Sequence, residues 1–295
     1  MIVAIGDLVD DIVVRVTGAH QPLSDTPATI VHRRGGSAAN VATMVARCGG
    51  QARFIGHVGD DHVGDRLLGE MSDDGVELAV RRGGRTGTLV VVVAPDGDRS
   101  FFTDRGSCSD LSDPDPGWLD GATALHVPAY CFADEPLAAS TGSLIAHATD
   151  RQVPVSIDAS STAVISKLGT RTMLDLIDRA HAEVVFANRD EAGMLGLGPG
   201  SPAPAATWTV VRNGGHETHL IDHRGATTTV MVPPVETVVD TTGAGDAFAA
   251  GWLLAREGAA SPTDAIDAAH RVATRVLGRA GADLDRTDTS SWSDA

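Results

Sequence analysis

Residues 240–251 read D-T-T-G-A-G-D-A-F-A-A-G. We expect the β-branched Val238 and Val239 to end a strand just before this run, and a helix over residues 247–257 to follow it. Glycines let the backbone approach a ligand closely, and the first amides of a helix have no acceptor within the helix. The run therefore predicts a turn whose N–H groups bind a phosphate or a developing anion.

Asp246 lies in this turn, where the predicted helix begins. A bound phosphate would repel a carboxylate here unless the carboxylate had a chemical task, and a proton acceptor is what a hydroxyl needs to attack phosphorus. The competing interpretation is an ordinary connecting turn. The two commonest nucleotide motifs do not fit, because Phe248 replaces the third small residue of the dinucleotide fingerprint and no G-x-x-x-x-G-K-[ST] occurs.

Composition limits the partners of the chain. Its 295 residues include 39 acidic and 23 basic side chains, a formal net charge of −16, which argues against nucleic acid or an anionic membrane as a partner. The three cysteines, Cys48, Cys108 and Cys131, show no C-x-x-C spacing and are expected to be reduced. The N-terminus has no basic leader and no apolar stretch reaches about 20 residues, so we expect a cytoplasmic protein.

The order of predicted elements indicates an α/β fold. From residue 122 onward, apolar strands alternate with helices, which is typical of a mostly parallel, doubly wound sheet with helices on both faces. Two β-rich segments, about 10–34 and 85–104, do not fit that layer, and we assign them to a small accessory sheet. No linker or repeat divides the chain, so residues 1–295 are expected to form a single domain.

Three further groups of polar residues are candidates for a site. Asp7, Asp10 and Asp11 follow the first predicted strand, at the edge where open parallel sheets bind ligands. Gly35-Gly36-Ser37 and Asn40 resemble a second close-approach turn, although such a sequence is also an ordinary loop. The N-x-x-E spacing of Asn188 and Glu191 suits a hydrated Mg²⁺, with a helix N-cap as the competing explanation. A zinc site is disfavoured at His216, His219 and His223 because no cysteine is near and no H-E-x-x-H frame occurs.

Taken in this order, these pieces resemble the ribokinase-like (PfkB) family of carbohydrate kinases. The resemblance covers residues 2–282, with a highly specific D-T-x-G-A-G-D signature near the C-terminus and a moderately specific G-G-x-x-x-N motif near the N-terminus. It implies a doubly wound sheet with a small β lid over the sugar site, often used to form a homodimer. It also implies ATP and Mg²⁺ as cofactors and a sugar as substrate.

The resemblance also assigns roles to individual residues. It makes Asp246 the base that takes the proton of the sugar hydroxyl, and the amides of Gly243, Ala244 and Gly245 the anion hole. Glu191 would bind Mg²⁺ through water, together with Asn188. The residues implied for the sugar are Asp11, Gly35, Gly36, Ser37, Asn40 and Arg105; those implied for the nucleotide are Asn188, Glu191, Arg212, Gly214 and His270; and those implied for a possible K⁺ are Asp240, Thr242 and Gly281.

Some positions depart from ribokinases proper. Val9 and Ser37 stand where ribokinases have asparagine and lysine, which weakens ribose as the substrate, and Arg212 begins an R-N-G segment in place of the usual Thr/Lys-Leu-Gly. We therefore expect ATP-dependent phosphorylation of a sugar or sugar-acid hydroxyl. A nucleoside kinase of the same family and a non-catalytic sugar-binding relative remain as alternatives. A sugar phosphate is a further candidate acceptor, because Arg33, Arg34 and Arg105 offer a local basic patch.

Overall fold

The computed structural model describes residues 1–19, 21–94, 96, 98–279, 281, 282 and 284. Residues 280, 283 and 285–295 of the predicted domain, and residues 20, 95 and 97 of its predicted accessory segments, lie outside that part. In the described ranges, no helix is long and apolar enough to cross a membrane.

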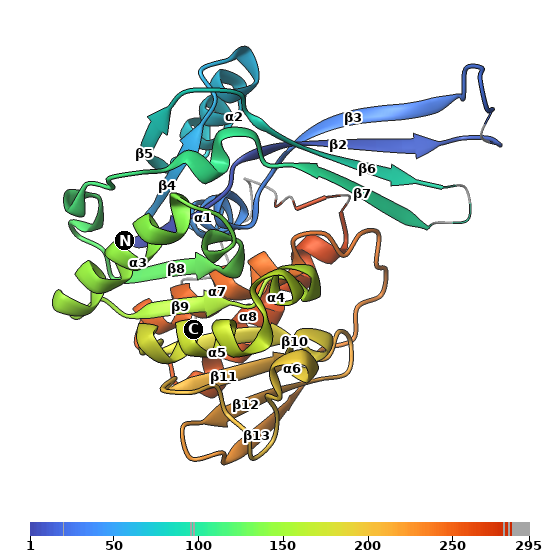
Figure 1. The fold of residues 1–295 in the computed structure, drawn as a ribbon. Coiled ribbons are helices and arrows are strands. Elements are labelled where there is room, and N and C mark those ends of the chain that lie inside the picture. The colour runs from blue at the N-terminus through green and yellow to red at the C-terminus, as the bar shows by residue number, and fades with distance from the viewer. Residues whose placement is uncertain (20, 95, 97, 280, 283, 285–295) are drawn as a thin grey trace.

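The central layer is a nine-stranded sheet in the order β13-β12-β11-β10-β9-β8-β1-β4-β5 (Figure 1). Neighbouring strands are parallel from β11 to β5, whereas β12 pairs antiparallel with both β11 and β13. Its strands are β1 (Ile2–Ile5), β4 (Ala52–Val58), β5 (Glu77–Arg82), β8 (Ala124–Pro128), β9 (Val155–Asp158), β10 (Val184–Asn188), β11 (Trp208–Arg212), β12 (Glu217–Asp222) and β13 (Thr227–Met231).

Helices cover both faces of this sheet, as the continuous apolar strands predict. In β1, Ile2 and Ala4 point into one core, while Val3 and Ile5 point into the other. The first core includes α1 (Ser37–Arg47), α2 (His62–Asp73), α7 (Ala244–Glu257) and α8 (Pro262–Leu277); the second includes α3 (Leu137–Asp150), α4 (Thr162–Leu168), α5 (Thr170–Ala180) and α6 (Arg189–Leu195). Short 3₁₀ helices connect other elements: η1 (Gly106–Asp110), η2 (Pro116–Leu119) and η3 (Ala129–Phe132).

A second, four-stranded sheet extends away from the body of the molecule (Figure 1). Its order is β3-β2-β6-β7, formed by β2 (Val9–Val16), β3 (Ala28–Gly35), β6 (Gly87–Val93) and β7 (Arg99–Asp104). We call this sheet the lid. It confirms that the two segments excluded from the central layer pair with each other, because β2 and β6 run side by side in parallel register.

One expected element is wrong. Val238 and Val239 do not end a strand, because they lie in an irregular segment after β13 and are 55% and 50% exposed. Pro233 and Pro234 precede them, and prolines supply no N–H for a ladder. The helix that follows begins at Ala244, three residues before the predicted start.

Candidate active site

A cavity of about 1200 Å³ lies between the lid and the carboxyl ends of the parallel strands. Of the candidate residues from the sequence, Asp10, Arg33, Arg34, Gly35, Asp240 and Gly281 lie outside its lining. Those that line it are Asp7, Asp11, Gly36, Ser37, Asn40, Arg105, Asn188, Glu191, Arg212, Gly214, Thr242, Gly243, Ala244, Gly245, Asp246 and His270.

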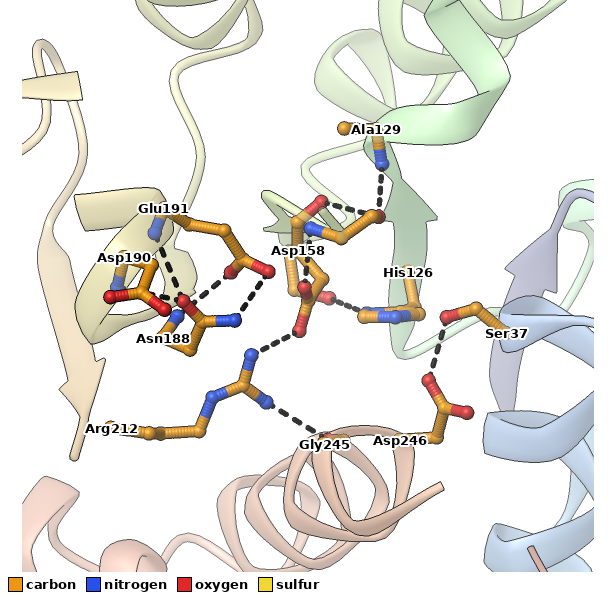
Figure 2. A network of polar contacts seen from close by, with 12 residues as sticks. Ser37, His126, Ala129, Asp158, Asn188, Asp190, Glu191, Arg212, Gly245 and Asp246 are labelled. Atoms are coloured by element: carbon orange, nitrogen blue, oxygen red, sulfur yellow. Dashed lines mark hydrogen bonds and ion pairs between the residues drawn. The ribbon is translucent and has the colours of Figure 1, made fainter. Parts of the chain in front are cut away.

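Asp246 lies in the first turn of α7 and is held by α1, from the other half of the chain. The Ser37 hydroxyl donates a hydrogen bond of 2.7 Å to one carboxylate oxygen, and the Asn40 amide donates one of 2.8 Å to the other (Figure 2 shows the Ser37 contact). Burial raises the pKa of Asp246 to about 6, although both hydrogen bonds oppose that rise. The carboxyl group is thus held in one orientation, and its pKa is closer to neutral pH than that of an ordinary aspartate. Both properties suit a general base.

The turn before α7 needs glycine at its N-cap. Gly243 has φ 76°, in the left-handed region, and a Cβ atom on it would lie 2.3 Å from the Cβ of Ala282. The amide of Ala244 bonds back to the Thr241 carbonyl at 3.3 Å, which closes the turn. Amides in the first helical turn have no intrahelical acceptor, so the turn offers N–H donors and the positive end of the helix dipole beside Asp246.

A second buried carboxyl group lies in the part of the cavity lined by Asp11, Arg105, Asp134 and Lys167, which we call the acceptor side. Asp11 has one buried oxygen that accepts no hydrogen bond among the described residues, and burial followed by repulsion from Asp10 raises its pKa to about 6. Gly35 makes room for it, since a Cβ there would lie 2.9 Å from the Asp11 carboxyl carbon. A donor from a ligand hydroxyl would satisfy this oxygen, which suits a polyol.

Arg105 also lines the acceptor side, but acidic side chains already surround it. It donates two hydrogen bonds to Asp7, at 2.9 and 2.7 Å, and one of 2.9 Å to Asp134. Lys167 lies 2.6 Å from the other oxygen of Asp134. The sequence indicated Arg105 as a ligand for the substrate. In the structure its charge is balanced by Asp7 and Asp134. The sequence argument had noted Asp7 only as an acid at the end of a predicted strand.

On the opposite side, Asn188 and Glu191 form a capping box at the start of α6. The Asn188 side chain accepts from the amides of Asp190 and Glu191, both at 2.9 Å, and the Glu191 carboxylate accepts from the Asn188 backbone at 2.8 Å (Figure 2). Both interpretations of the N-x-x-E spacing therefore meet here: Asn188 is an N-cap, and the buried Glu191 still faces the cavity. Burial and then the nearby Asp158 raise the pKa of Glu191.

Asp158 is a site residue that the sequence argument did not single out. It ends β9, lines the cavity, and accepts a 2.9 Å hydrogen bond from Arg212, which ends β11. The signal was available, since an acid at the end of a predicted parallel strand was the reason for noting Asp7.

The wall of the cavity around His270 is mostly apolar, with Thr218 and Thr274 as its other polar side chains among the described lining residues. The His270 Nε2 atom lies 2.9 Å from the Thr218 hydroxyl, its ring packs edge-on against Phe248, and burial lowers its pKa, so the imidazole is neutral. Gly214, with φ 57°, turns the chain beside this wall. The remaining apolar lining is formed by Val232, Pro233, Pro234, Val235, Val238 and Leu277. A flat heteroaromatic base fits such a wall.

Asp240 and its neighbours form a closed cluster of hydrogen bonds. The Asp240 carboxylate accepts from the Thr242 amide and hydroxyl, from the Gly281 amide and from the Arg99 guanidinium, at 3.0, 2.8, 3.0 and 3.2 Å. These donors hold the pKa of Asp240 below its usual value, even though burial alone would raise it. Thr242, Gly281 and Arg99 thus all act as donors to the Asp240 carboxylate, and the Arg99 guanidinium supplies a positive charge beside it.

Comparison with known proteins agrees with this geometry. The profile of the pfkB family carbohydrate kinases matches residues 1–289. Fructokinase-1 of Oryza sativa subsp. japonica is 28% identical over 274 residues, which cover 87% of this chain and 82% of the relative.

Solved structures share the fold. Adenosine kinase from Sinorhizobium meliloti superposes with a TM-score of 0.81 at 23% identity, and a putative ribokinase II from E. coli in complex with ATP and Mg²⁺ gives 0.81 at 20% identity. Each covers 95% of this chain and 94% of the other. The matched profile, the lid over a doubly wound sheet and the oriented acid at the start of α7 lead to one conclusion: this chain belongs to the pfkB family of carbohydrate kinases.

Proposed function

We propose that this protein transfers the terminal phosphoryl group of MgATP to a hydroxyl of an uncharged sugar, with Asp246 as the general base. The observation that carries the proposal is the carboxylate of Asp246, oriented by Ser37 and Asn40 at the N-terminus of α7. A base is thereby placed next to donors that suit a phosphoryl group, in one cavity large enough for two substrates.

The proposed reaction is an in-line displacement. Asp246 accepts the proton of the attacking hydroxyl, and the first-turn amides of α7 stabilise the charge on the transferred phosphoryl oxygens. Asn188 and Glu191 would hold Mg²⁺ through water, since Glu191 is a cavity-lining carboxylate whose two oxygens are fixed by Asn188. When bound, the ion neutralises charge on the phosphates. The apolar wall around His270 would receive the adenine.

The charge balance of the acceptor side supports an uncharged sugar over a sugar acid or a sugar phosphate. Arg105 pairs with Asp7 and Asp134, and Lys167 pairs with Asp134, so the four charges cancel. Asp11 adds a further carboxyl group on the same side. Of the other two arginines in the predicted basic patch, Arg34 bonds to Asn40, and neither lines the cavity. An anionic acceptor would therefore meet no unbalanced cation among the described residues that line this side of the cavity.

A nucleoside acceptor is less well supported. Nucleoside kinases of this family clamp the base with aromatic or large apolar side chains, and the lid aromatics best placed for that, Phe101 and Phe102, are each 61% exposed and do not line the cavity. The lid residues that do line it are Val9, Asp11, Leu89 and Thr103. This wall is small and partly polar, which suits a sugar ring.

Three finer expectations belong to the same proposal. We propose that Arg99 supplies the positive charge beside Asp240, so that activity does not depend on potassium. We propose a homodimer formed by two lids, because Phe101, Phe102, Ile30 and Val31 are exposed on the projecting sheet. A reducing cytoplasm suits the three buried, unpaired cysteines.

The test is turnover by the Asp246→Asn variant in an ADP-release assay with ketoses, aldoses, sugar acids, sugar phosphates and nucleosides. We expect kcat for the best sugar to fall by about 10²- to 10⁴-fold, because the base is lost. Calorimetry should show nearly unchanged sugar affinity. Substantial residual kcat would remove Asp246 from the role of base, and a wild-type enzyme that releases ADP with none of these acceptors would overturn the proposed activity.

A further inference from the structure

Four charged side chains meet on the acceptor side of the cavity, and we call them the acceptor cluster: Asp7, Arg105, Asp134 and Lys167. They come from four separate parts of the chain, since Asp7 follows β1, Arg105 follows β7, Asp134 follows η3 and Lys167 lies near the end of α4. Their formal charges cancel in sum. The pairing within the cluster is nevertheless unequal, because two of the four side chains depend on Asp134 to different degrees.

Arg105 is paired with Asp7 whether or not Asp134 is present. Its Nε atom and one terminal nitrogen donate to the two carboxylate oxygens of Asp7 at 2.9 and 2.7 Å, which is the bidentate geometry in which a guanidinium binds a carboxylate most strongly. The two side chains are only 17% and 13% exposed. Its other terminal nitrogen donates to Asp134 at 2.9 Å. Arg105 and Asp7 therefore form a neutral pair by themselves.

Lys167 has no partner other than Asp134 in the part of the chain that the structure describes. Its ammonium lies 2.6 Å from one carboxylate oxygen of Asp134. An ammonium group carries three N–H donors, so two of them are left over. Ala163 lies one turn earlier on the same face of α4 and also lines the cavity, so this face of the helix is turned toward the ligand.

Asp134 thus occupies the place that a carboxylate of a ligand would take. One of its oxygens accepts from Lys167 and the other from Arg105. Burial alone would raise the pKa of Asp134, but these two cations outweigh it and hold the pKa below its usual value, so the carboxyl group is ionised. A substrate carboxylate would need the same two donors and would meet the negative charge of Asp134 instead.

We propose that Asp134 is the residue that determines the charge of the acceptor: its carboxylate fills the position in which Lys167 and Arg105 would otherwise bind a sugar acid, and the enzyme therefore selects uncharged sugars. This inference rests on the proposed phosphorylation of a sugar. Neither Asp134 nor Lys167 was a candidate from the sequence. Without Asp134 the acceptor cluster would hold two cations and one acid, and Lys167 would be unpaired. Specificity would thus come from an element that repels the wrong substrate.

The experiment uses two pairs of acceptors that differ only by oxidation to an acid: D-fructose with 2-keto-D-gluconate, oxidised at C1, and D-glucose with D-glucuronate, oxidised at C6. For the wild type, Asp134→Asn and Asp134→Ala, ADP release gives kcat/KM and calorimetry gives Kd. In Asp134→Ala we expect the acid-to-sugar ratio of kcat/KM to rise about 5- to 20-fold for at least one pair. Asp134→Asn should give a smaller rise, because its amide still fills the space.

Three further measurements separate charge from other effects. Lys167 is 54% exposed, so the gain in Asp134→Ala should shrink as salt is raised. Adding Lys167→Met to Asp134→Ala should cancel the gain, because the unpaired cation is removed. Glu183→Ala is the matched control: Glu183 pairs with Arg256 at 2.9 Å, is 27% exposed and lies outside the described cavity lining. It removes the same formal charge and should leave the ratio as in the wild type.

An unchanged ratio of kcat/KM and of Kd in both folded Asp134 variants would overturn the proposal, as would an equal rise in Glu183→Ala. So would a wild-type enzyme that already prefers the acid of either pair. A loss of sugar affinity in Asp134→Ala with no gain for the acid would make Asp134 an ordinary ligand of the sugar and would also contradict it. Calorimetry needs no turnover, so the ratio of Kd values tests Asp134 even if the ADP-release assay shows that the proposed reaction does not occur.

Discussion

Two carboxyl groups in the cavity, Asp246 and Asp11, have pKa values raised to about 6 by burial. Asp246 keeps two hydrogen-bond donors that stabilise its charged form, whereas Asp11 has an oxygen with no donor among the described residues. The same residue type thus serves two tasks. In the proposed reaction, Asp246 takes a proton and Asp11 accepts a hydrogen bond from the sugar.

The raised pKa of Asp246 predicts an acid limb in the pH–rate profile. Only the ionised carboxylate can accept a proton, so log kcat/KM should fall as the pH drops below about 6. Steady-state rates between pH 5 and 8.5, with circular dichroism to verify folding, provide the measurement. A flat profile down to pH 5 in a folded enzyme would contradict the assignment.

Asp11 predicts an unusual effect of mutation on stability. Its pKa is higher in the folded state than its ordinary value of 3.8, so the folded state binds the extra proton and stability falls as the pH rises from about 4 through 6. Asp11→Asn removes the buried charge and should raise the free energy of unfolding at pH 7.5 by about 1 kcal/mol, or the Tm by about 2–4 °C. The gain should disappear near pH 4, as measured by thermal unfolding.

Asp61→Asn is the opposing control. Burial would raise the pKa of Asp61, but hydrogen bonds from Thr86 and Gly64 outweigh it and hold the pKa at about 2. This carboxylate stabilises the fold when charged, and the contribution is lost as the pH falls toward 2. At pH 7.5 the variant should therefore be less stable than the wild type. If Asp11→Asn also loses stability at pH 7.5, the charged Asp11 carboxylate must stabilise the folded state, and the prediction is wrong.

At the scale of elements, strand β7 of the lid meets the segment before α7 through one ion pair. Arg99 lies 3.2 Å from Asp240, whose carboxylate also caps the turn through Thr242. The lid is therefore tied to the backbone that leads into the anion hole. This contact links the position of the lid to the geometry of the helix start.

The Arg99 contact predicts how the enzyme responds to potassium. Wild-type kcat should change less than about twofold when K⁺ replaces a bulky organic cation at equal ionic strength, since Asp240 already has a cation. Arg99→Ala should lower kcat severalfold, because a buried carboxylate then lacks its counter-charge. Arg85→Ala is the control, because Arg85 lies just before strand β6 of the lid and pairs with the exposed Asp104. Strong potassium activation of the wild-type enzyme would contradict the prediction.

At the scale of the whole molecule, the lid carries apolar side chains that this chain does not cover. Phe101 and Phe102 are each 61% exposed on β7, and Ile30 is 59% exposed on β3. Exposed apolar residues on a projecting sheet are what the proposed homodimer would bury.

This surface predicts a dimer of about 61 kDa, twice the 30.4 kDa of one chain. The double variant Phe101→Ser/Phe102→Ser should shift the mass measured by light scattering toward 30.4 kDa, because the apolar contact is lost. Met231→Ser is the matched control, as Met231 is 68% exposed on the far edge of the central sheet. A monomeric wild type at micromolar concentration, or equal effects of both variants, would rule out a lid interface.

The fold was predictable from the sequence wherever local pattern and long-range packing agree. Continuous apolar strands alternating with helices led to the parallel sheet, and the segments that broke this alternation led to the lid. The pattern failed at Val238 and Val239, where β-branched residues had no neighbouring strand to pair with. The β propensity of a residue depends on its own side chain, whereas a strand forms only where a neighbouring strand supplies hydrogen bonds.

The site was predictable to the extent that single motifs determine it. The turn at Gly243 and the acid at Asp246 could be identified from their own sequence. The pairing of Arg105 with Asp7 and Asp134 could not, because these acids reach it from distant parts of the chain. The link from Arg212 to Gly245 is likewise a property of the folded chain alone, since the partners are 33 positions apart in the sequence.

The bonds from Ser37 and Asn40 to Asp246 span 209 and 206 residues, which has a consequence for biosynthesis. Helix α1, most of which is buried, packs against α7 in the finished protein. At about 5–20 residues per second, a ribosome needs on the order of 10–40 s to add the residues that separate them. During that time β1 and β4 are available to cover one side of α1, but the side that packs against α7 lacks its native partner and leaves apolar surface of the N-terminal half exposed.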